Sequence, residues 1–535
     1  MATTNENFII EGTILVKYNG SSDNVVIPDG IVEIGESAFA YSSVVSVTIP
    51  DGVTTIGEYA FRDCDKLVNI TLSNSVKEIE ESAFIRCKEL AEFTMPDSVE
   101  TIGRSAFTDC KKLATLNIGK GLQFIGRWAF NGCEGLTGVY YAGELSDWCQ
   151  ITLDYSCPNP VLYAQNLYIH NELITELTVT KDFGQIKPGV FAGCTHLHSV
   201  TIEDGVTEIP DGAFDHCIGL KKISVPNGIV TIGKEAFQRC FDLQEFTIPE
   251  SVTKIGESAF CGCLALKEMV IPNSVKEIGK YAFRACDGLT SIIIPETIEK
   301  IGSAAFMECY NLETITLPNT LQTIPDDLVA NCKKLSRVDI PNSVTRIGAA
   351  AFLRCKQLKT LVIPASVTEI DAFAFSGCTG LTSVALPDGV TRLNDRLFED
   401  CTNLQSVKFS HDVDHIGESV FENCKCLQKI ELPQKLVRLW SKAFKKCESL
   451  TSVTIGKRIT ELNQRTFMGC INLTDVTISN EIKTIEEGVF RDCTSLQEIH
   501  FDGTVEEWKK VRVWKLWKVN SPLSKVICTD GEVLL

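Results

Sequence analysis

The sequence predicts a curved, right-handed solenoid of short stacked coils, with a parallel β-sheet on one face and short strands or helical turns on the other. Two observations lead to this prediction. Cysteines recur every 23 residues in two runs, Cys64–Cys133 and Cys194–Cys493. A phenylalanine column follows the same rhythm, and of its 19 slots only Val329 lacks the ring. A fixed period of this length indicates stacked supersecondary units that share one core.

Each slot of the repeat has a physical explanation. The unit reads L-x-x-V-x-I-P-x-x-V-x-x-I-G-x-x-A-F-x-x-C-x-x, which by length and spacing belongs among leucine-rich repeats. In the unit that starts at Leu243, Phe246 and Ile248 alternate with Thr247, the period of a half-buried strand. Stacked units would join these strands into a parallel sheet with a spacing of about 4.8 Å.

The second half of the unit returns the chain to the next coil. Gly256 follows the inward Ile255, and Pro210 and Pro325 occupy the same slot in other units. Because proline cannot adopt a positive φ, we expect this slot to open a short helical turn. Phe260 then fills the space between the two sides of the coil and forms a spine with its copies.

The array needs caps at both ends, because a terminal unit has no neighbour to cover it. We expect an N-terminal cap and first unit (1–44), a first array (45–138), an insertion (139–180), a second array (181–501) and a C-terminal cap (502–535). The insertion opens with YAGELSDW (Tyr141–Trp148), which resembles FDGTVEEW (Phe501–Trp508) in the final segment. The insertion is therefore interpreted as a cap followed by a restart.

Charge and hydropathy exclude several classes of function. The chain carries 51 Lys and Arg against 69 Asp and Glu, a net charge of −18. This balance argues against general binding to nucleic acid. No apolar run is long enough to span a membrane. The start, MATTNENFII, lacks a basic and apolar leader, so the sequence as given favours the cytoplasm.

The 23 cysteines are best explained by structure, since 18 of them occupy the repeat slot. Parallel side chains on stacked coils lie close together but do not present their sulfurs at a disulfide dihedral. We expect a ladder of buried, reduced thiols that act as small apolar groups. Whether Cys149 and Cys157 pair is left open by the sequence.

Catalytic, metal and cofactor sites are not predicted. Neighbouring units carry Cys194, His196, His198, His216 and Cys217, but no CxxC pair accompanies them. Exposed histidines beside ladder cysteines explain this cluster better than zinc does. Intact hydrolase, phosphate-loop and dinucleotide motifs are missing from the sequence, which favours a non-enzymatic protein.

Deviations from the repeat indicate where a partner would bind. The outward strand slot mostly holds Thr but becomes mildly apolar along one stripe, Val270, Ile293, Thr316, Asp339, Val362 and Ala385. Such a stripe is typical of a contact surface, although β-propensity alone explains it equally well. A second candidate is the lysine-rich terminal segment with Trp508, Trp514 and Trp517, for which a cap is the favoured interpretation.

The IPxxVxxIGxxAFxxC units resemble the BspA-type (Treponema-type) leucine-rich repeat family over about Val26 to Phe501. The resemblance implies a curved solenoid used for binding, often at cell surfaces as an adhesin.

Two functional hypotheses follow. The first is a non-enzymatic scaffold that binds a protein or glycan on its sheet face, with the adhesin role implied by the resemblance. The alternative is a cytoplasmic recognition or assembly module that self-associates or binds an intracellular protein.

Overall fold

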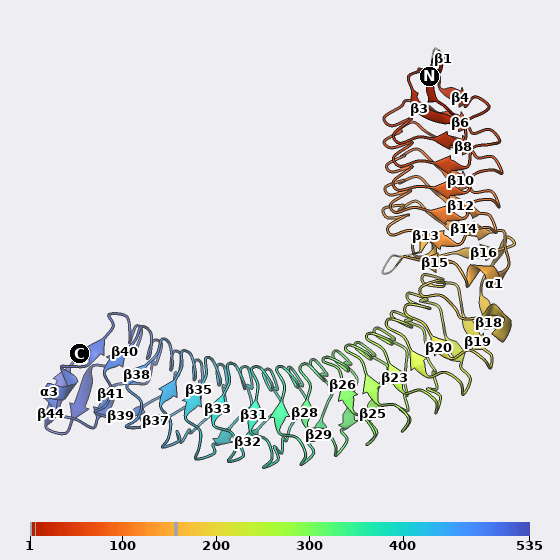
Figure 1. Cartoon of the computed structure of the whole chain (residues 1–535). Helices are drawn as coiled ribbons and strands as arrows, with labels where there is room; N and C mark the ends of the chain where they lie inside the picture. The colour runs from red at the N-terminus through yellow and green to blue at the C-terminus, as the bar shows by residue number, and fades with distance from the viewer. Residues whose placement is uncertain (1–2, 6, 155–158) are drawn as a thin grey trace. The chain divides into compact units, whose positions relative to one another are not determined.

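The computed structural model describes residues 3–5, 7–154 and 159–535. The chain divides into two compact units, Met1–Leu266 and Lys267–Leu535, and each is described here by itself. In both units the coils lie one on another with their strands side by side (Figure 1). The predicted solenoid with parallel strands is thereby confirmed in each unit.

One coil of the first unit illustrates the architecture. A long strand, β6 (Ser46–Thr48), is followed by a short strand, β7 (Thr55–Ile56), on the other side of the coil. Val47 and Ile56 point inward from these strands, and Phe61 lies between them. The flanking strand residues stay outside, which is the alternation expected of a half-buried strand.

In the first unit a nine-stranded sheet begins with β1 (Thr3–Asn5), β2 (Phe8–Glu11) and β3 (Ile14–Tyr18). It continues with the short strands β5 (Glu33–Ile34), β7, β9 (Glu78–Ile79), β11 (Thr101–Ile102), β13 (Phe124–Ile125) and β15 (Thr152–Leu153). A later group is β20 (Glu208–Ile209), β22 (Thr231–Ile232) and β23 (Lys254–Ile255). The long strands form the series β4 (Asn24–Val26), β6 and β8 (Asn69–Thr71); β10 (Glu92–Thr94), β12 (Thr115–Ile118), β14 (Gly138–Tyr141), β16 (Leu167–Ile169) and β17 (Glu172–Leu173); and β18 (Glu176–Val179), β19 (Ser199–Ile202) and β21 (Lys222–Ser224). Helical segments are confined to α1 (Leu145–Trp148), α2 (Pro160–Ala164) and the 3-10 turn η1 (Lys181–Phe183) among the described residues of this unit.

The second unit repeats this plan. Its long strands form β25 (Ser291–Ile293), β27 (Thr314–Thr316) and β29 (Arg337–Asp339); β32 (Ser383–Ala385) and β34 (Ser406–Lys408); and β37 (Ser452–Ile455), β39 (Asp475–Ile478), β41 (Glu498–Phe501), β43 (Lys525–Cys528) and β44 (Gly531–Leu534). Its short strands are β24 (Glu277–Ile278), β26 (Lys300–Ile301), β28 (Thr323–Ile324), β30 (Arg346–Ile347), β31 (Glu369–Ile370), β33 (Arg392–Leu393), β35 (His415–Ile416), β36 (Arg438–Leu439), β38 (Glu461–Leu462), β40 (Thr484–Ile485) and β42 (Arg512–Val513). One short helix, α3 (Val505–Trp508), lies near its end.

The predicted phenylalanine spine is present in both units. The rings of Phe61 and Phe84 stack with centroids 5.1 Å apart and planes within 4° of parallel. In the second unit Phe444 and Phe467 stack at 5.6 Å. All four rings are fully buried, so every coil except that of Val329 contributes one aromatic layer to the core of its unit.

The segment before and after each ring differs from the expected helical turn. The residue two before the ring and the residue two after it both have positive φ, as Ser258 (54°) and Gly262 (80°) do around Phe260. Each turn closes by a bond between residues three apart, as Ser42 N–H donates to Phe39 O at 2.9 Å. The intervening N–H groups donate to the next coil, for example Phe39 N–H to Ala60 O at 2.7 Å. The segment is therefore a run of β-turns that adds a third ladder between coils.

The glycine slot does not require a positive φ, as the prolines in this slot predicted, but the reason for glycine was not evident from the sequence. Gly57 and Gly256 do not adopt a positive φ. A Cβ on Gly57 would lie 2.6 Å from the carbonyl oxygen of Ile34 on the preceding coil. Glycine is used here for close approach between coils and not for backbone conformation.

The two segments that were predicted to resemble each other have the same local structure. Trp148 of α1 packs edge-on against Tyr141 at 5.3 Å, and Trp508 of α3 packs against Phe501 at 5.2 Å. Both helices begin with a capping box. After each helix, a short strand and a long strand pair in parallel with the preceding coil, and an antiparallel strand (β17 or β44) follows. The division of the chain into two arrays stays a prediction.

Candidate functional site

The stripe predicted from the outward strand slot lies wholly in the second unit. Ile293, Thr316 and Asp339 occupy matching positions on β25, β27 and β29, which pair in parallel and in register. Ile293 is 67% exposed although it is a large apolar residue. The inward residues between them are buried, so the outward side chains sit on a fixed surface.

The other stripe residues are exposed but less regularly placed. Val270 and Val362 are 79% and 78% exposed and lie outside the named strands. Ala385 is exposed on β32, where its partner on β34 is Lys408. The described strand pairing thus joins Ile293, Thr316 and Asp339 directly and does not join the remaining three to them.

One charged pair interrupts the stripe. Arg337 Nη2 lies 3.0 Å from Asp339 Oδ2, and both side chains are largely exposed. Such a pair contributes about 0–1 kcal/mol to stability because water screens it. The pair therefore adds little to the stability of this face.

The terminal tryptophans have two different environments. Trp508 and Trp517 are 4% and 6% exposed, and Trp517 packs edge-on against Phe490 at 5.9 Å. Trp514 is 44% exposed, with the Arg512 guanidinium 5.4 Å from its ring. Trp508 and Trp517 cover the last coils, and Trp514 is the exposed one of the three.

A half-buried aromatic pair was missed in the sequence. Tyr140 on β14 and Tyr168 on β16 pair in register, and their rings stack at 4.3 Å. They occupy the outward slot of the strands, next to Asn117 of β12. Applying the strand alternation to GVYYAG in the insertion would have located Tyr140, but Tyr168 follows an irregular loop that hides the period.

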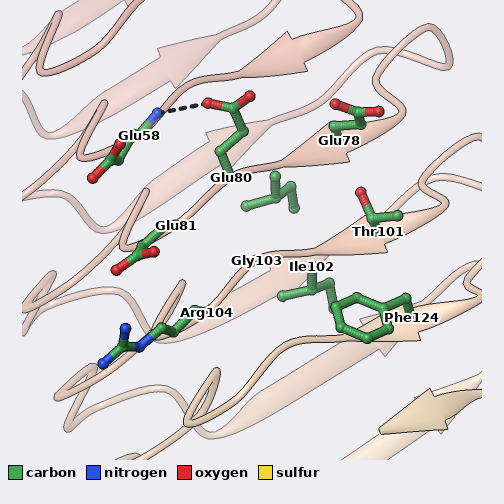
Figure 2. A pocket seen from close by; sticks show the side chains of 10 residues that line it. Glu58, Glu78, Glu80, Glu81, Thr101, Ile102, Gly103, Arg104 and Phe124 are labelled. Atoms are coloured by element: carbon green, nitrogen blue, oxygen red, sulfur yellow. Dashed lines mark hydrogen bonds between the residues drawn. The ribbon is translucent and has the colours of Figure 1, made fainter. Parts of the chain in front are cut away.

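A hollow of about 410 Å³ in the first unit gathers carboxylates. Figure 2 shows Glu78, Glu80 and Glu81 around it, with the Glu58 backbone N–H donating to Glu80 Oε2 at 3.1 Å. Partial burial raises the pKa of Glu80, and neighbouring carboxylates including Glu78 add to this. Glu80 stands in the slot that holds Gly57 and Gly103 in the flanking coils.

The cysteine ladder is buried and reduced. Among the described cysteines none forms a disulfide, and thiols of the repeat slot donate to the carbonyl of the ring-slot residue on the preceding coil, as Cys217 does to Phe191 O at 3.2 Å and Cys355 to Val329 O at 3.3 Å. Burial raises the pKa of Cys194 to about 12, so the thiol stays protonated at neutral pH. Cys157 lies outside the described residues, so its pairing with Cys149 is not addressed.

Histidines of the cluster considered for zinc lie outside the core. His216 contacts Asp215 at 2.7 Å and Arg239 at 2.5 Å, while Cys217 points inward. No group of three or more His, Cys, Asp or Glu in the described ranges is arranged to hold a metal ion. No helix within those ranges is long and apolar enough to cross a membrane.

Stacked parallel coils with buried columns and an exposed strand face define a repeat-solenoid protein of the leucine-rich class. The sequence matches the family described as BspA type leucine rich repeat region (6 copies) over residues 16–137, 164–290, 276–405 and 393–512. The chain belongs to this family.

Solved structures show where similar coils occur. A leucine-rich repeat protein from Bacteroides ovatus is 28% identical, with a TM-score of 0.54, over 62% of this chain and 92% of that one. A leucine rich cell surface protein from Faecalibacterium prausnitzii is 21% identical over 96% and 97% of the chains, with a TM-score of 0.27. The T. pallidum leucine rich repeat protein is 24% identical over 45% and 91%, also with a TM-score of 0.27. No curated protein sequence matches this chain.

Proposed function

We propose that this protein is a non-enzymatic scaffold that binds a protein ligand on the outward strand face of residues 267–535. The observation that carries the proposal is the exposure of Val270, Ile293 and Val362 in an outward slot of the repeat that elsewhere in the chain mostly holds Thr. Exposed aliphatic side chains gain free energy when a partner removes them from water. Aliphatic groups suit a protein better than a glycan, which would need polar contacts.

The rigidity of the coils supports this role. Ile292 and Ile315, which lie beneath the stripe, are buried, and the rings of Phe283 and Phe306 stack at 5.3 Å behind them. The surface is therefore ordered before a partner arrives, and binding costs little conformational entropy.

The experiment compares two double variants of the full chain. Val270→Glu with Ile293→Glu puts two charges on the stripe, and Thr71→Glu with Thr94→Glu puts two charges in the same slot of the first unit. Immobilised wild-type protein and both variants are exposed to one extract, and the captured proteins are quantified by mass spectrometry. A protein retained by wild type and by the Thr variant, but lost from the stripe variant, supports the proposal.

Equal capture by all three forms would contradict the proposed surface. Thermal denaturation of the three proteins provides the folding control, because outward residues contribute little to the core. Similar melting temperatures are expected for all of them.

The proposal also includes a location at the cell surface. The family resemblance favours a surface adhesin, which predicts that protease added to intact producing cells removes the protein. Complete protection on intact cells, with cleavage after lysis, would favour the cytoplasmic alternative.

Self-association is the second candidate because apolar side chains lie exposed near the C-terminus. Trp514 and Leu516 are both exposed beside β42, and Leu534 is exposed on β44. Self-association is tested by comparing the sedimentation of the wild type with that of the double variant Trp514→Glu with Leu516→Glu. A concentration-dependent dimer that the double variant loses would support self-association, and a monomer in both would contradict it.

A further inference from the structure

A polar groove of about 610 Å³ runs along the edge of the second unit. Two columns of side chains line it. One column holds the residue two positions after the ring slot of each coil, from Glu308 to Asn423, and the other holds the residue directly after each ladder cysteine, from Tyr310 to Thr402. The first column crosses six coils, so at about 4.8 Å per coil the groove extends for roughly 24 Å. Its length and direction fit a linear polymer laid along the stack.

The hollow exists because two side chains are short where their neighbours are long. Gly377 has no side chain in the column that also holds Arg354 and Asp400, and a Cβ there would lie 2.8 Å from Arg354 Cγ. Thr379 follows Lys356 in the other column. Small residues next to long basic ones leave a depression with cations on one flank.

The groove carries three cations in a chain whose net charge is −18. Lys333, Arg354 and Lys356 form no ion pair within 4.0 Å among the described residues; Asp287 interacts with Lys333 only at longer range. Some cations elsewhere pair with an acid on an adjacent coil, as Lys300 does with Glu277 at 2.8 Å.

Both acidic residues of the groove are held by other groups. Glu308 Oε2 accepts from Arg284 Nε at 2.8 Å, and Asp400 Oδ1 accepts from Asn423 Nδ2 at 2.7 Å. Lys333 Nζ lies 4.0 Å from the centre of the Tyr310 ring, which fixes its side chain without neutralising it. The three cations therefore remain available to an anionic ligand.

A peptide would gain little in this groove. The backbone N–H groups of its floor are already used between coils: Asn331 N–H donates to Leu353 O, Arg354 N–H to Ser376 O and Gly377 N–H to Glu399 O at 2.6–2.7 Å. Strand addition needs free backbone groups, so it has no partner here. The lining also offers one aromatic ring and no aliphatic side chain to anchor a peptide.

The uncharged side chains that line the groove are of the types that recognise sugars. Asn331 presents an amide and Thr402 presents a hydroxyl. Asn423 keeps its Oδ1 as an acceptor while its Nδ2 donates to Asp400, and the Thr379 hydroxyl donates to Lys356 O at 3.5 Å. Lys333 covers one face of the Tyr310 ring. Hydroxyl-rich ligands are bound by such amides and hydroxyls, and carboxylate or sulfate groups are bound by Lys and Arg. We propose that this groove binds a linear polysaccharide that carries carboxylate or sulfate groups, at a site separate from the strand face.

The test uses the full chain and a matched pair of triple variants. The groove triple is Lys333→Gln, Arg354→Asn and Lys356→Gln. The control triple is Arg86→Asn, Lys88→Gln and Lys111→Gln, which removes the same charge from the same two columns in the first unit. Asn is used at Arg354 and Arg86 because both have positive φ, which Asn tolerates.

Binding of a heparin oligosaccharide and of a polygalacturonate oligosaccharide is measured by calorimetry at low and physiological salt, with neutral dextran and poly-L-glutamate as competitors. We expect at least one of the two acidic polysaccharides to bind wild type and the groove triple to lose at least tenfold in affinity. The control triple should change less than twofold, and binding should weaken with salt. Absence of binding to both, equal loss in both triples, or equal competition by poly-L-glutamate would overturn the proposal.

Discussion

The thiol of Cys87 donates a hydrogen bond of 3.1 Å to the backbone carbonyl oxygen of Phe61 on the preceding coil. The same oxygen accepts the Cys64 N–H at 3.3 Å. The relationship recurs along both units, as between Cys401 and Phe375 at 3.2 Å. Each ladder cysteine therefore fills apolar space and also links two coils, which explains its conservation of position within the repeat without any redox role.

The first prediction concerns thiol reactivity. We expect most ladder thiols of the native protein to react slowly with a thiol reagent at pH 8, because the reactive species is the exposed thiolate. Cys261 and Cys426 are half-buried and should react earlier. Cys261→Ser with Cys426→Ser should shrink the fast phase, followed by absorbance. Rapid labelling of most thiols without unfolding would refute the buried ladder.

The second prediction concerns alkaline stability. Burial raises the pKa of Cys133 and of Cys378 from the ordinary 9.0 to about 12. Between these values the unfolded chain has released the proton and the folded chain has kept it. The contribution of these thiols to the free energy of unfolding is therefore fully present below pH 9, and it is lost as the pH rises toward 12.

Urea unfolding at pH 7, 9 and 10.5 measures this fall. Cys133→Val with Cys378→Val removes two of the titrating groups, so its stability should decrease less steeply with pH than that of wild type. Parallel pH dependences for the two proteins would argue against thiol titration as the cause.

The third prediction concerns the spine. Phe260 is fully buried and packs on Phe237 at 5.3 Å and on Phe246 at 4.9 Å. Phe260→Ala should lower the free energy of unfolding by about 3–5 kcal/mol, the usual cost of removing a buried ring. Phe260→Leu should cost less, since Val329 already fills one ring slot. Chemical denaturation checks both, and an Ala variant as stable as the Leu variant would contradict a packed spine.

The core was predictable because each slot packs against copies of itself. A side chain such as Phe61 must suit both neighbouring coils, so the same residue type recurs and the period is visible. The turns around the ring were not predicted correctly, because their left-handed positions hold many residue types, including Tyr59, Asp63 and Arg86. The sequence did contain a signal for these turns, because β-branched residues are missing from the left-handed positions: no Val, Ile or Thr among the described residues has positive φ.

The candidate surfaces were only partly predictable for a different reason. The exposure of Ile293 followed from strand alternation within one unit. The groove of Lys333, Arg354 and Lys356 depends on which side chains lie beside each other across coils and on the short Gly377 between them. Apart from Arg354 and Lys356, these residues are 21 to 44 positions apart in sequence, so their proximity becomes visible only when whole columns are compared.

The fourth prediction concerns the acidic hollow. The pKa of Glu80 is raised by burial and by nearby carboxylates, so the ionised side chain disfavours the fold at neutral pH. Glu80→Gln removes the charge and retains an oxygen for the Glu58 N–H. We expect a higher melting temperature than wild type at pH 7.

The sign of the pH effect distinguishes this cause from others. A raised carboxyl pKa contributes stability at low pH that is lost as pH rises through the folded-state pKa. The advantage of Glu80→Gln should therefore shrink as the pH falls toward 4, where Glu80 is protonated. A constant difference across this range would show that charge is not responsible.

The fifth prediction concerns the left-handed turn positions. Arg465 has a φ of 57° and is exposed, and the corresponding residue of the next coil is Gly488 with 68°. A side chain branched at Cβ is particularly disfavoured there, because it collides with the backbone in this conformation. Arg465→Val should lower the free energy of unfolding by about 1–2 kcal/mol relative to Arg465→Ala, on the scale of left-handed strain. Arg465→Gly relieves that strain but loses chain entropy, so it should lie close to wild type. Urea unfolding of the three variants measures the order, and a Val variant as stable as the Ala variant would show that the turn adopts another conformation in solution.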